Sequence, residues 1–201
     1  MPVLDSDWST DRCSRRNFDY CGLAIWGESV RARLVGPRLT LRLFDSKGER
    51  IDTNGAPSRW YHLNVTNARR SARATNVRVV LTKVSRPSAD GQVHPTRLSG
   101  PIQLAWQHGH VLPQFPTLGP ALNADLGFVK KDEVFRLTPT IIPNNLNVEV
   151  KRGERVVIEA LAISDETESA PVCVEIAWDG VWSEDATEME KHLVAKQVAC
   201  L

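Results

Sequence analysis

Residues 59–84 read RWYHLNVTNARRSARATNVRVVLTKV, which is two runs of alternating apolar and polar residues separated by a short basic loop. Residues 155–178 read RVVIEALAISDETESAPVCVEIAW and repeat this arrangement around an acidic loop. Successive side chains of a strand point to opposite faces, so each run can bury one face and expose the other. Shorter runs of the same kind occur from residue 39 onward. The pattern therefore predicts an all-β sandwich of two antiparallel sheets.

Only the last part of the chain has the spacing of a helix. Residues 183–193 carry apolar side chains at helical intervals. Asp185 and Glu188 stand three positions apart, as in a capping box with Asp at the N-cap. We therefore expect a short C-terminal helix, followed by a last strand through residues 194–198.

The length and composition suit one globular domain. The chain has 201 residues, of which 42% are hydrophobic and 24% charged, as in folded rather than disordered proteins. Residues 1–36 have no clear period, and we expect an irregular or weakly ordered N-terminal arm there. The sandwich domain is predicted to span residues 37–201, which is an ordinary size for a single core.

Several classes of function receive no support from the sequence. The formal net charge of +1 gives no overall attraction to nucleic acid. No signal peptide or long apolar run is visible, so no membrane span is expected. No nucleotide, metal or hydrolase motif occurs, so no cofactor and no catalytic residue is predicted. The four cysteines form no disulfide framework or CxxC pair, which favours a reducing, cytoplasmic location: Cys13, Cys21, Cys173 and Cys200.

The charges are distributed unevenly. Residues 58–86 hold seven basic side chains and no acid, whereas residues 165–190 hold nine acids and no Lys or Arg. One interpretation is a basic loop, Arg69, Arg70 and Arg73, that binds an acidic protein partner or a second copy of the chain. The other is that the two segments neutralise each other, within the fold or between copies, or are simply solvated.

Aromatic residues offer a different candidate site. Trp60 and Trp182 lie at expected strand ends or turns, where an indole ring can be half exposed. Exposed rings on a sandwich can stack on a sugar or a peptide, so these two tryptophans are candidate binding residues. The alternative is that they close the open ends of the sandwich.

His108 and His110 are the only pair of residues with local metal-ligand spacing. On a strand, residues two apart share a face, so both imidazoles could meet one ion. A metal-dependent hydrolase would need a third ligand brought by the fold, from His62, His94, His192 or an aspartate. Because no third ligand lies nearby in the sequence, the favoured interpretation is that both histidines are polar side chains of an exposed loop, and no metal site is predicted.

Part of the chain resembles a known family. The loop and strand that contain Ala74, Asn76 and Val77 resemble the A-x-N-V segment of immunoglobulin-like modules of the CARDB type. Three stretches together resemble a group of small bacterial proteins of unknown function: residues 61–84, 135–145 (FRLTPTIIPNN) and 175–194 (EIAWDGVWSEDATEMEKHLV). The resemblance implies an immunoglobulin-like sandwich and brings no catalytic residue with it.

These observations favour a non-catalytic module for protein interaction or scaffolding. Carbohydrate or peptide binding through Trp60 and Trp182 is the first alternative. A metal-dependent hydrolase built on His108 and His110 is the second.

Overall fold

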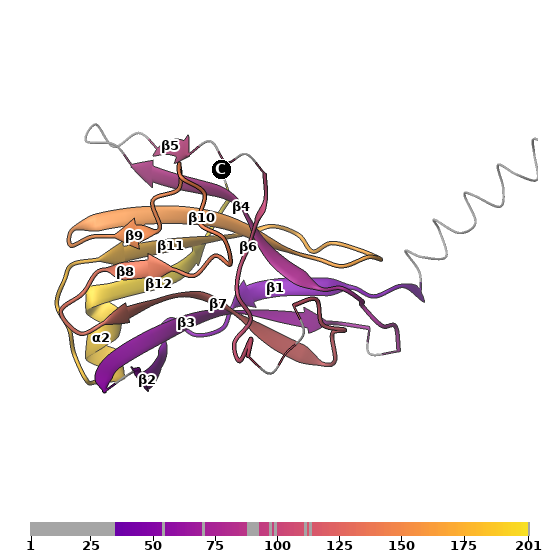
Figure 1. Cartoon of the computed structure of the whole chain (residues 1–201), viewed down its shortest axis with the longest axis horizontal. Coiled ribbons are helices and arrows are strands. Elements are labelled where there is room, and N and C mark those ends of the chain that lie inside the picture. The colour runs from indigo at the N-terminus through magenta and orange to yellow at the C-terminus, as the bar shows by residue number, and fades with distance from the viewer. Residues whose placement is uncertain are drawn as a thin grey trace, which may run out of the picture. The chain divides into compact units, whose positions relative to one another are not determined.

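The computed structural model of the chain describes residues 35–53, 55–69, 71–87, 93–96, 98, 100–110, 112 and 114–200. The arm expected at residues 1–36 lies almost wholly outside this part of the chain and stays a prediction. From Pro37 onward the described residues belong to one compact unit made of two antiparallel sheets (Figure 1).

The first sheet has the order β1-β3-β7-β8-β9, and β2 pairs with β3. Its strands are β1 (Leu39–Leu43), β2 (Glu49–Thr53), β3 (Ala56–Asn67), β7 (Ala121–Lys130), β8 (Phe135–Leu137) and β9 (Glu149–Val150). The second sheet has the order β12-β11-β10-β4-β5, and β6 pairs with β4. Its strands are β4 (Arg78–Pro87), β5 (Val93–Thr96), β6 (Ile102–Gln103), β10 (Glu154–Ile163), β11 (Val172–Trp178) and β12 (Leu193–Val198).

The alternating residues that predicted the strands form the core. Leu63 and Val65 of β3, Leu81 of β4, Ile158 of β10 and Ile176 of β11 are all fully buried in one cluster. Burying each such side chain is worth roughly 1.5–3 kcal/mol, so the inner faces of these strands supply most of the hydrophobic stabilisation. The prediction of a two-sheet antiparallel sandwich is confirmed.

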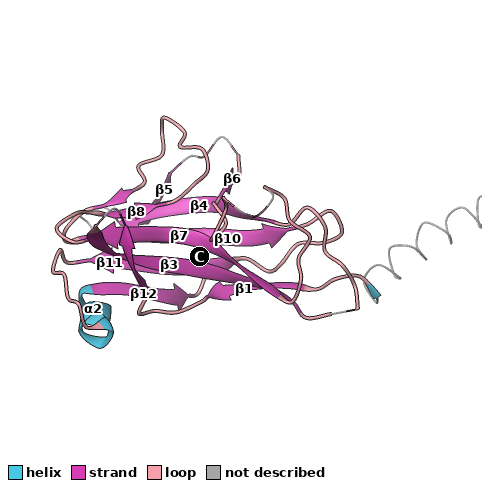
Figure 2. Ribbon diagram, turned by 60° about the horizontal axis from the view of Figure 1, so that its bottom comes forward, coloured by secondary structure: helices cyan, strands magenta, loops and turns pink. Residues whose placement is uncertain are grey.

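The central pairings of the two sheets are those of an immunoglobulin-like sandwich. The chain crosses from the first sheet to the second after β3. In the first sheet β3 pairs with β7, and in the second sheet β4 pairs with β10. These two pairings correspond to strands B with E and C with F of the immunoglobulin fold. In Figure 2 the long strands of the two sheets run through the body of the domain, with α2 at one end.

The short C-terminal helix is also confirmed. Helix α2 (Ala186–His192) begins after Asp185, whose side chain accepts a hydrogen bond from the amide of Glu188. The buried side chain of Met189 fixes the helix against the core. Lys191 and His192 in its last turn complement the negative end of the helix dipole. Among the described residues no helix is long and apolar enough to cross a membrane.

One expectation about the cysteines was wrong. Cys173 and Cys200 form a disulfide, although the sequence indicated no disulfide framework. Cys173 pairs with Val198 in the β11–β12 ladder, so Cys200, two residues further on, reaches the same face. The disulfide could not be predicted from the sequence, because it depends on how β11 and β12, which a helix separates in the chain, are aligned in the sheet. Cys13 and Cys21 lie outside the described residues.

Candidate ligand-binding site

The outer face of the first sheet carries a row of large polar and aromatic side chains. On β3 the residues that alternate with the core residues Leu63 and Val65 face outward. In the ladder with β7, Trp60 stands opposite Phe128, His62 opposite Asp125, and Asn64 opposite Asn123. The register shifts between Tyr61 and His62, and β3 and β7 are paired on both sides of this shift.

His62 is deeply enclosed on this face. Its side chain is only 2% exposed, and Nδ1 lies 2.9 Å from Oδ1 of Asp125. Because a carboxylate only accepts, Nδ1 donates the hydrogen to Asp125. Nε2 lies 3.5 Å from Oε2 of Glu49 and has no hydrogen-bond partner. A buried ring nitrogen without a partner is costly, and a ligand hydroxyl would satisfy it.

Amide side chains continue from His62 across the same face. Asn64 donates from Nδ2 to Oδ1 of Asn123 at 2.7 Å. Asn123 donates to Oε1 of Gln107 at 2.9 Å, and Gln107 donates to Oε2 of Glu49 at 3.0 Å. Gln107 reaches this row because its backbone amide bonds the carbonyl of Asn123, beside β7. The chain of bonds holds each amide in a fixed orientation.

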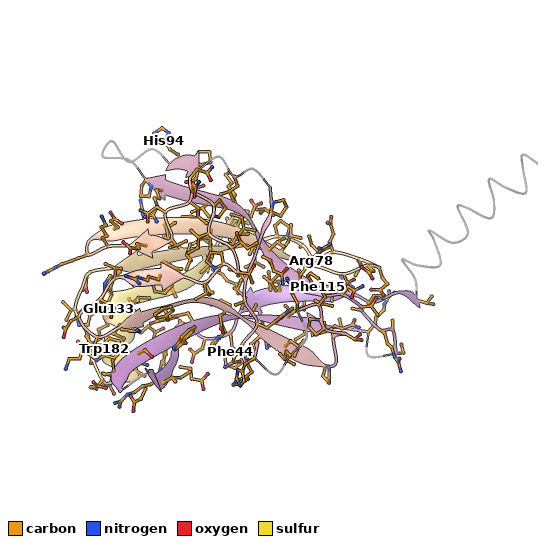
Figure 3. The ribbon with its side chains drawn as sticks, in the orientation of Figure 1. Phe44, Arg78, His94, Phe115, Glu133 and Trp182 are labelled. Carbon is orange, nitrogen blue, oxygen red and sulfur yellow. A yellow bond between two sulfur atoms is a disulfide. The ribbon has the colours of Figure 1, made fainter. Side chains whose placement is uncertain are left out.

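Aromatic rings border the polar row on one side. Trp60 and Phe128 are stacked, with ring centroids 4.5 Å apart, and the ammonium group of Lys130 lies 6.0 Å from the Phe128 ring. Phe44, which is 54% exposed, lies on the other side of the row, after the end of β1. Figure 3 labels Phe44 at the edge of the domain, away from Trp182 near α2.

Two adjoining pockets lie over this face. One, of about 350 Å³, is lined by Phe44, Glu49, Trp60, His62 and Asn123. The other, of about 470 Å³, shares Phe44 and Asn123 with the first. Both volumes are in the range of pockets that bind small molecules. Hydrogen-bonding groups and apolar rings therefore meet in one concave surface.

The site has part of the geometry of an acid–base centre but not all of it. The Asp125–His62 pair is oriented like the base and its orienting carboxylate in nucleophilic enzymes. In such sites the base is hydrogen-bonded to a hydroxyl or thiol. Nε2 of His62 has no such bond in the described part of the chain, and the carboxylate of Glu49 lies 3.5 Å from it. The arrangement is suited to holding a polar ligand.

Comparisons with known proteins add no identity. Neither a protein-family model nor a curated protein matches the chain. The resemblance to CARDB-type modules therefore remains a prediction, while the sandwich itself is seen directly in the sheets.

The two candidate tryptophans lie in different places. Trp60 is half-buried on the outer face of the first sheet, in the site just described. Trp182 lies between β11 and α2, packs partly on the core and donates from its indole nitrogen to Glu184. The structure does not bring these two rings into one pocket among those lined by described residues. Trp60, with His62 and Glu49, lines one of the pockets over this face.

The basic residues do not form one patch. Arg59 is buried, and Arg86 pairs with Glu154 at 3.3 Å. In the predicted binding loop Arg73 is exposed, Arg69 is half-buried and Arg70 lies outside the described residues. Whether this loop binds a partner remains a prediction.

The acidic loop is held by the segment that follows the basic loop. Asp165 accepts a hydrogen bond from Asn76, and Glu166 accepts bonds from the hydroxyl and the amide of Thr75. Partial burial alone would raise the pKa of Glu166, but these bonds outweigh it and lower the pKa below its ordinary value of 4.5. Asn76, part of the A-x-N-V segment, adopts a positive φ of 52° that asparagine tolerates. The acidic loop is thus held by two neutral residues that follow the basic loop.

His108 and His110 lie in a turn and not on a strand. Both are exposed, and their ring centroids are 6.2 Å apart. Within the described residues neither joins a group of three His, Cys, Asp or Glu ligand atoms that approach within 4.8 Å of one another. His108 instead lines the larger of the two pockets.

Sequence reasoning placed His62 and Asn64 on the outer face but did not identify them as a site. Both alternate with core residues, which indicates exposure, yet they are 2% and 6% exposed. Asp125 and Asn123, which contact them, are about 60 positions away in the sequence. The signal in the sequence was that His62 and Asn64, two hydrogen-bonding residues, occupy the same face of an alternating strand.

Proposed function

We propose that the chain is a non-catalytic binding module that recognises a neutral carbohydrate on the outer face of its first sheet. The observation that carries the proposal is the buried, unpartnered Nε2 of His62 in a pocket that Trp60 also lines. Sugars present hydroxyl groups beside apolar C–H faces, so they fit polar groups placed next to an aromatic ring.

The hydrogen-bonding groups complement a polyol. Nε2 of His62 can form a hydrogen bond with one hydroxyl of the ligand, while Oε2 of Glu49, 3.5 Å away, accepts one from the neighbouring hydroxyl. The amides of Asn123 and Gln107 can both donate and accept, so they suit hydroxyls in either role. Because these side chains already hold one another, little side-chain entropy is lost on binding.

The sequence favoured a protein-interaction function, which depends on the basic loop. It concerns a different part of the surface and remains a second, separate proposal. The acidic loop is engaged by Thr75 and Asn76 of the same chain, which argues against its use in binding a second copy. An acidic partner for the exposed Arg73 stays open as a prediction.

The test begins with binding of the protein to an array of neutral oligosaccharides. The polysaccharide that corresponds to the oligosaccharides bound best is then added to native gels, in which binding slows the migration of the protein. Wild-type protein should be retarded by at least one polysaccharide. Trp60→Ala and Asn123→Ala should each weaken binding by roughly fivefold or more, since each removes a stacking or hydrogen-bonding contact worth about 1 kcal/mol or more.

Phe115→Ala is the matched control, because Phe115 is an exposed ring that lines neither pocket. It should bind like the wild type, and circular dichroism should show that all variants keep the fold. If no sugar binds, or if Trp60→Ala binds as tightly as Phe115→Ala, carbohydrate recognition at this face is wrong.

A further inference from the structure

The outer face of the second sheet brings two cysteines and a carboxylate together. Glu159 of β10 stands directly opposite Cys173 of β11, and Cys173 stands opposite Val198 of β12. Directly paired residues of neighbouring strands point to the same face. Cys200, two residues after Val198, reaches that face too and forms the disulfide with Cys173.

These three side chains supply a compact set of metal ligands. One ligand atom each from Glu159, Cys173 and Cys200 can be chosen so that all lie within 4.8 Å of one another. No other group of this kind occurs among the described residues. The Glu159 carboxylate is held in place by the hydroxyl of Thr82, which donates to Oε1 at 2.7 Å. That bond leaves the second carboxylate oxygen available to a metal.

We propose that Cys173, Cys200 and Glu159 bind a zinc ion when the disulfide is reduced. Zinc prefers thiolate and carboxylate ligands in a tetrahedral arrangement, with Zn–S distances of about 2.3 Å, so two sulfurs on one ion lie about 3.8 Å apart. After the disulfide is reduced, the sulfur atoms of Cys173 and Cys200 need to move apart only slightly to reach that spacing. Cys200 can provide it because it is exposed and lies beyond the end of β12.

The chemistry balances with an external dithiol as reductant. The dithiol gives up two electrons and becomes a disulfide, while the Cys173–Cys200 bond breaks to give two thiols. Zinc then replaces the two thiol protons, which are released to solvent. Three protein ligands leave the fourth position for water. Lys83, opposite Glu159 in the β4–β10 ladder, offsets part of the negative charge of the ligands.

The consequence is that Cys173 and Cys200 are joined either by a disulfide or by a zinc ion, depending on the redox conditions. Under oxidising conditions the disulfide joins Cys173 to Cys200, and the sulfurs cannot ligate. Under reducing conditions zinc joins the same residues and adds Glu159 of the next strand. β11 and the segment after β12 are then cross-linked in both redox states.

The experiment measures zinc in the full-length protein after gel filtration, with and without prior reduction by a dithiol. Reduced protein should retain about one zinc ion per chain and oxidised protein none. Zinc should raise the melting temperature of the reduced protein only. Cobalt, added to the reduced protein as a probe, should give the intense near-ultraviolet absorption of a thiolate–metal bond.

Variants separate this site from other thiols. Cys200→Ser changes an exposed residue and should lose the zinc, whereas Cys13→Ser with Cys21→Ser should retain it. Glu159→Gln should weaken zinc binding at least tenfold, and Glu175→Gln on the same face should leave it unchanged. The proposal is overturned if reduced wild type holds no zinc, or if Cys200→Ser or Glu159→Gln binds it as tightly as the wild type.

Discussion

Arg59 lies among the basic residues of segment 58–86, yet its side chain is 2% exposed. It donates to the carbonyls of Lys47 and Gly48 in the β1–β2 turn, and to the carbonyl of Glu184 just before α2. One guanidinium thus joins three segments at one end of the sandwich. A sequence pattern could not place it there, because these partners belong to a turn and a helix start that only the fold brings to β3.

Replacing Arg59 should therefore be costly. Arg59→Ala would leave three carbonyls without donors and open a cavity, and we expect a loss of about 3–5 kcal/mol in the free energy of unfolding. Urea denaturation measures it. The control is Arg50→Ala, since Arg50 is half exposed and pairs with the Glu184 carboxylate at 3.1 Å, an interaction worth up to about 1 kcal/mol. Equal losses in both variants would show that burial of Arg59 contributes nothing.

At the scale of elements, the sequence predicted strands with clear alternation and missed those without it. β3, β10 and β11 alternate apolar and polar residues, and all three are present. β2, with the sequence ERIDT, has no apolar face, so nothing in its composition indicated a strand. It forms because the chain, after the loop that ends β1, continues in the same direction along β3, where Glu49 pairs with Trp60. The candidate site depends on this strand for Glu49.

The acidic loop between β10 and β11 provides a test by pH. The pKa of Glu166 is lower in the folded protein than its ordinary value of 4.5, so its contribution to stability is present at neutral pH. That contribution is lost as the pH falls below 4.5 through the folded pKa. Glu166→Gln should lower the free energy of unfolding at pH 7, and the difference from wild type should shrink toward pH 3.

The matched control is Glu168→Gln, an exposed position in the same loop. Thermal unfolding of the three proteins between pH 3 and pH 7 measures the effect. A constant difference between Glu166→Gln and wild type over this range would mean that the bonds to Thr75 do not stabilise the ionised carboxylate.

For the whole molecule, fold class and candidate site differ in how far they can be predicted. The fold follows from alternation within each strand, a local property, and the inner faces assigned from it are buried. The site needs β3 beside β7, and the disulfide needs β12 beside β11, which are pairings between distant segments. Local patterns state which face of a strand is polar but not which strand lies next to it. Both outer faces therefore acquire features that the sequence did not indicate.

The whole sandwich depends on the inner faces staying apolar. Ile176 is fully buried between the sheets, and Ile176→Asp would place an unpaired charge there at a cost of several kcal/mol. Against a total stability of roughly 5–15 kcal/mol, this should unfold the domain. Ala177→Asp is the control, because Ala177 points to the opposite face and stands opposite Arg155, which can pair with the new charge. Circular dichroism and urea titration should show Ala177→Asp folded and Ile176→Asp unfolded. A cooperatively folded Ile176→Asp would mean that the inner face of β11 is assigned wrongly.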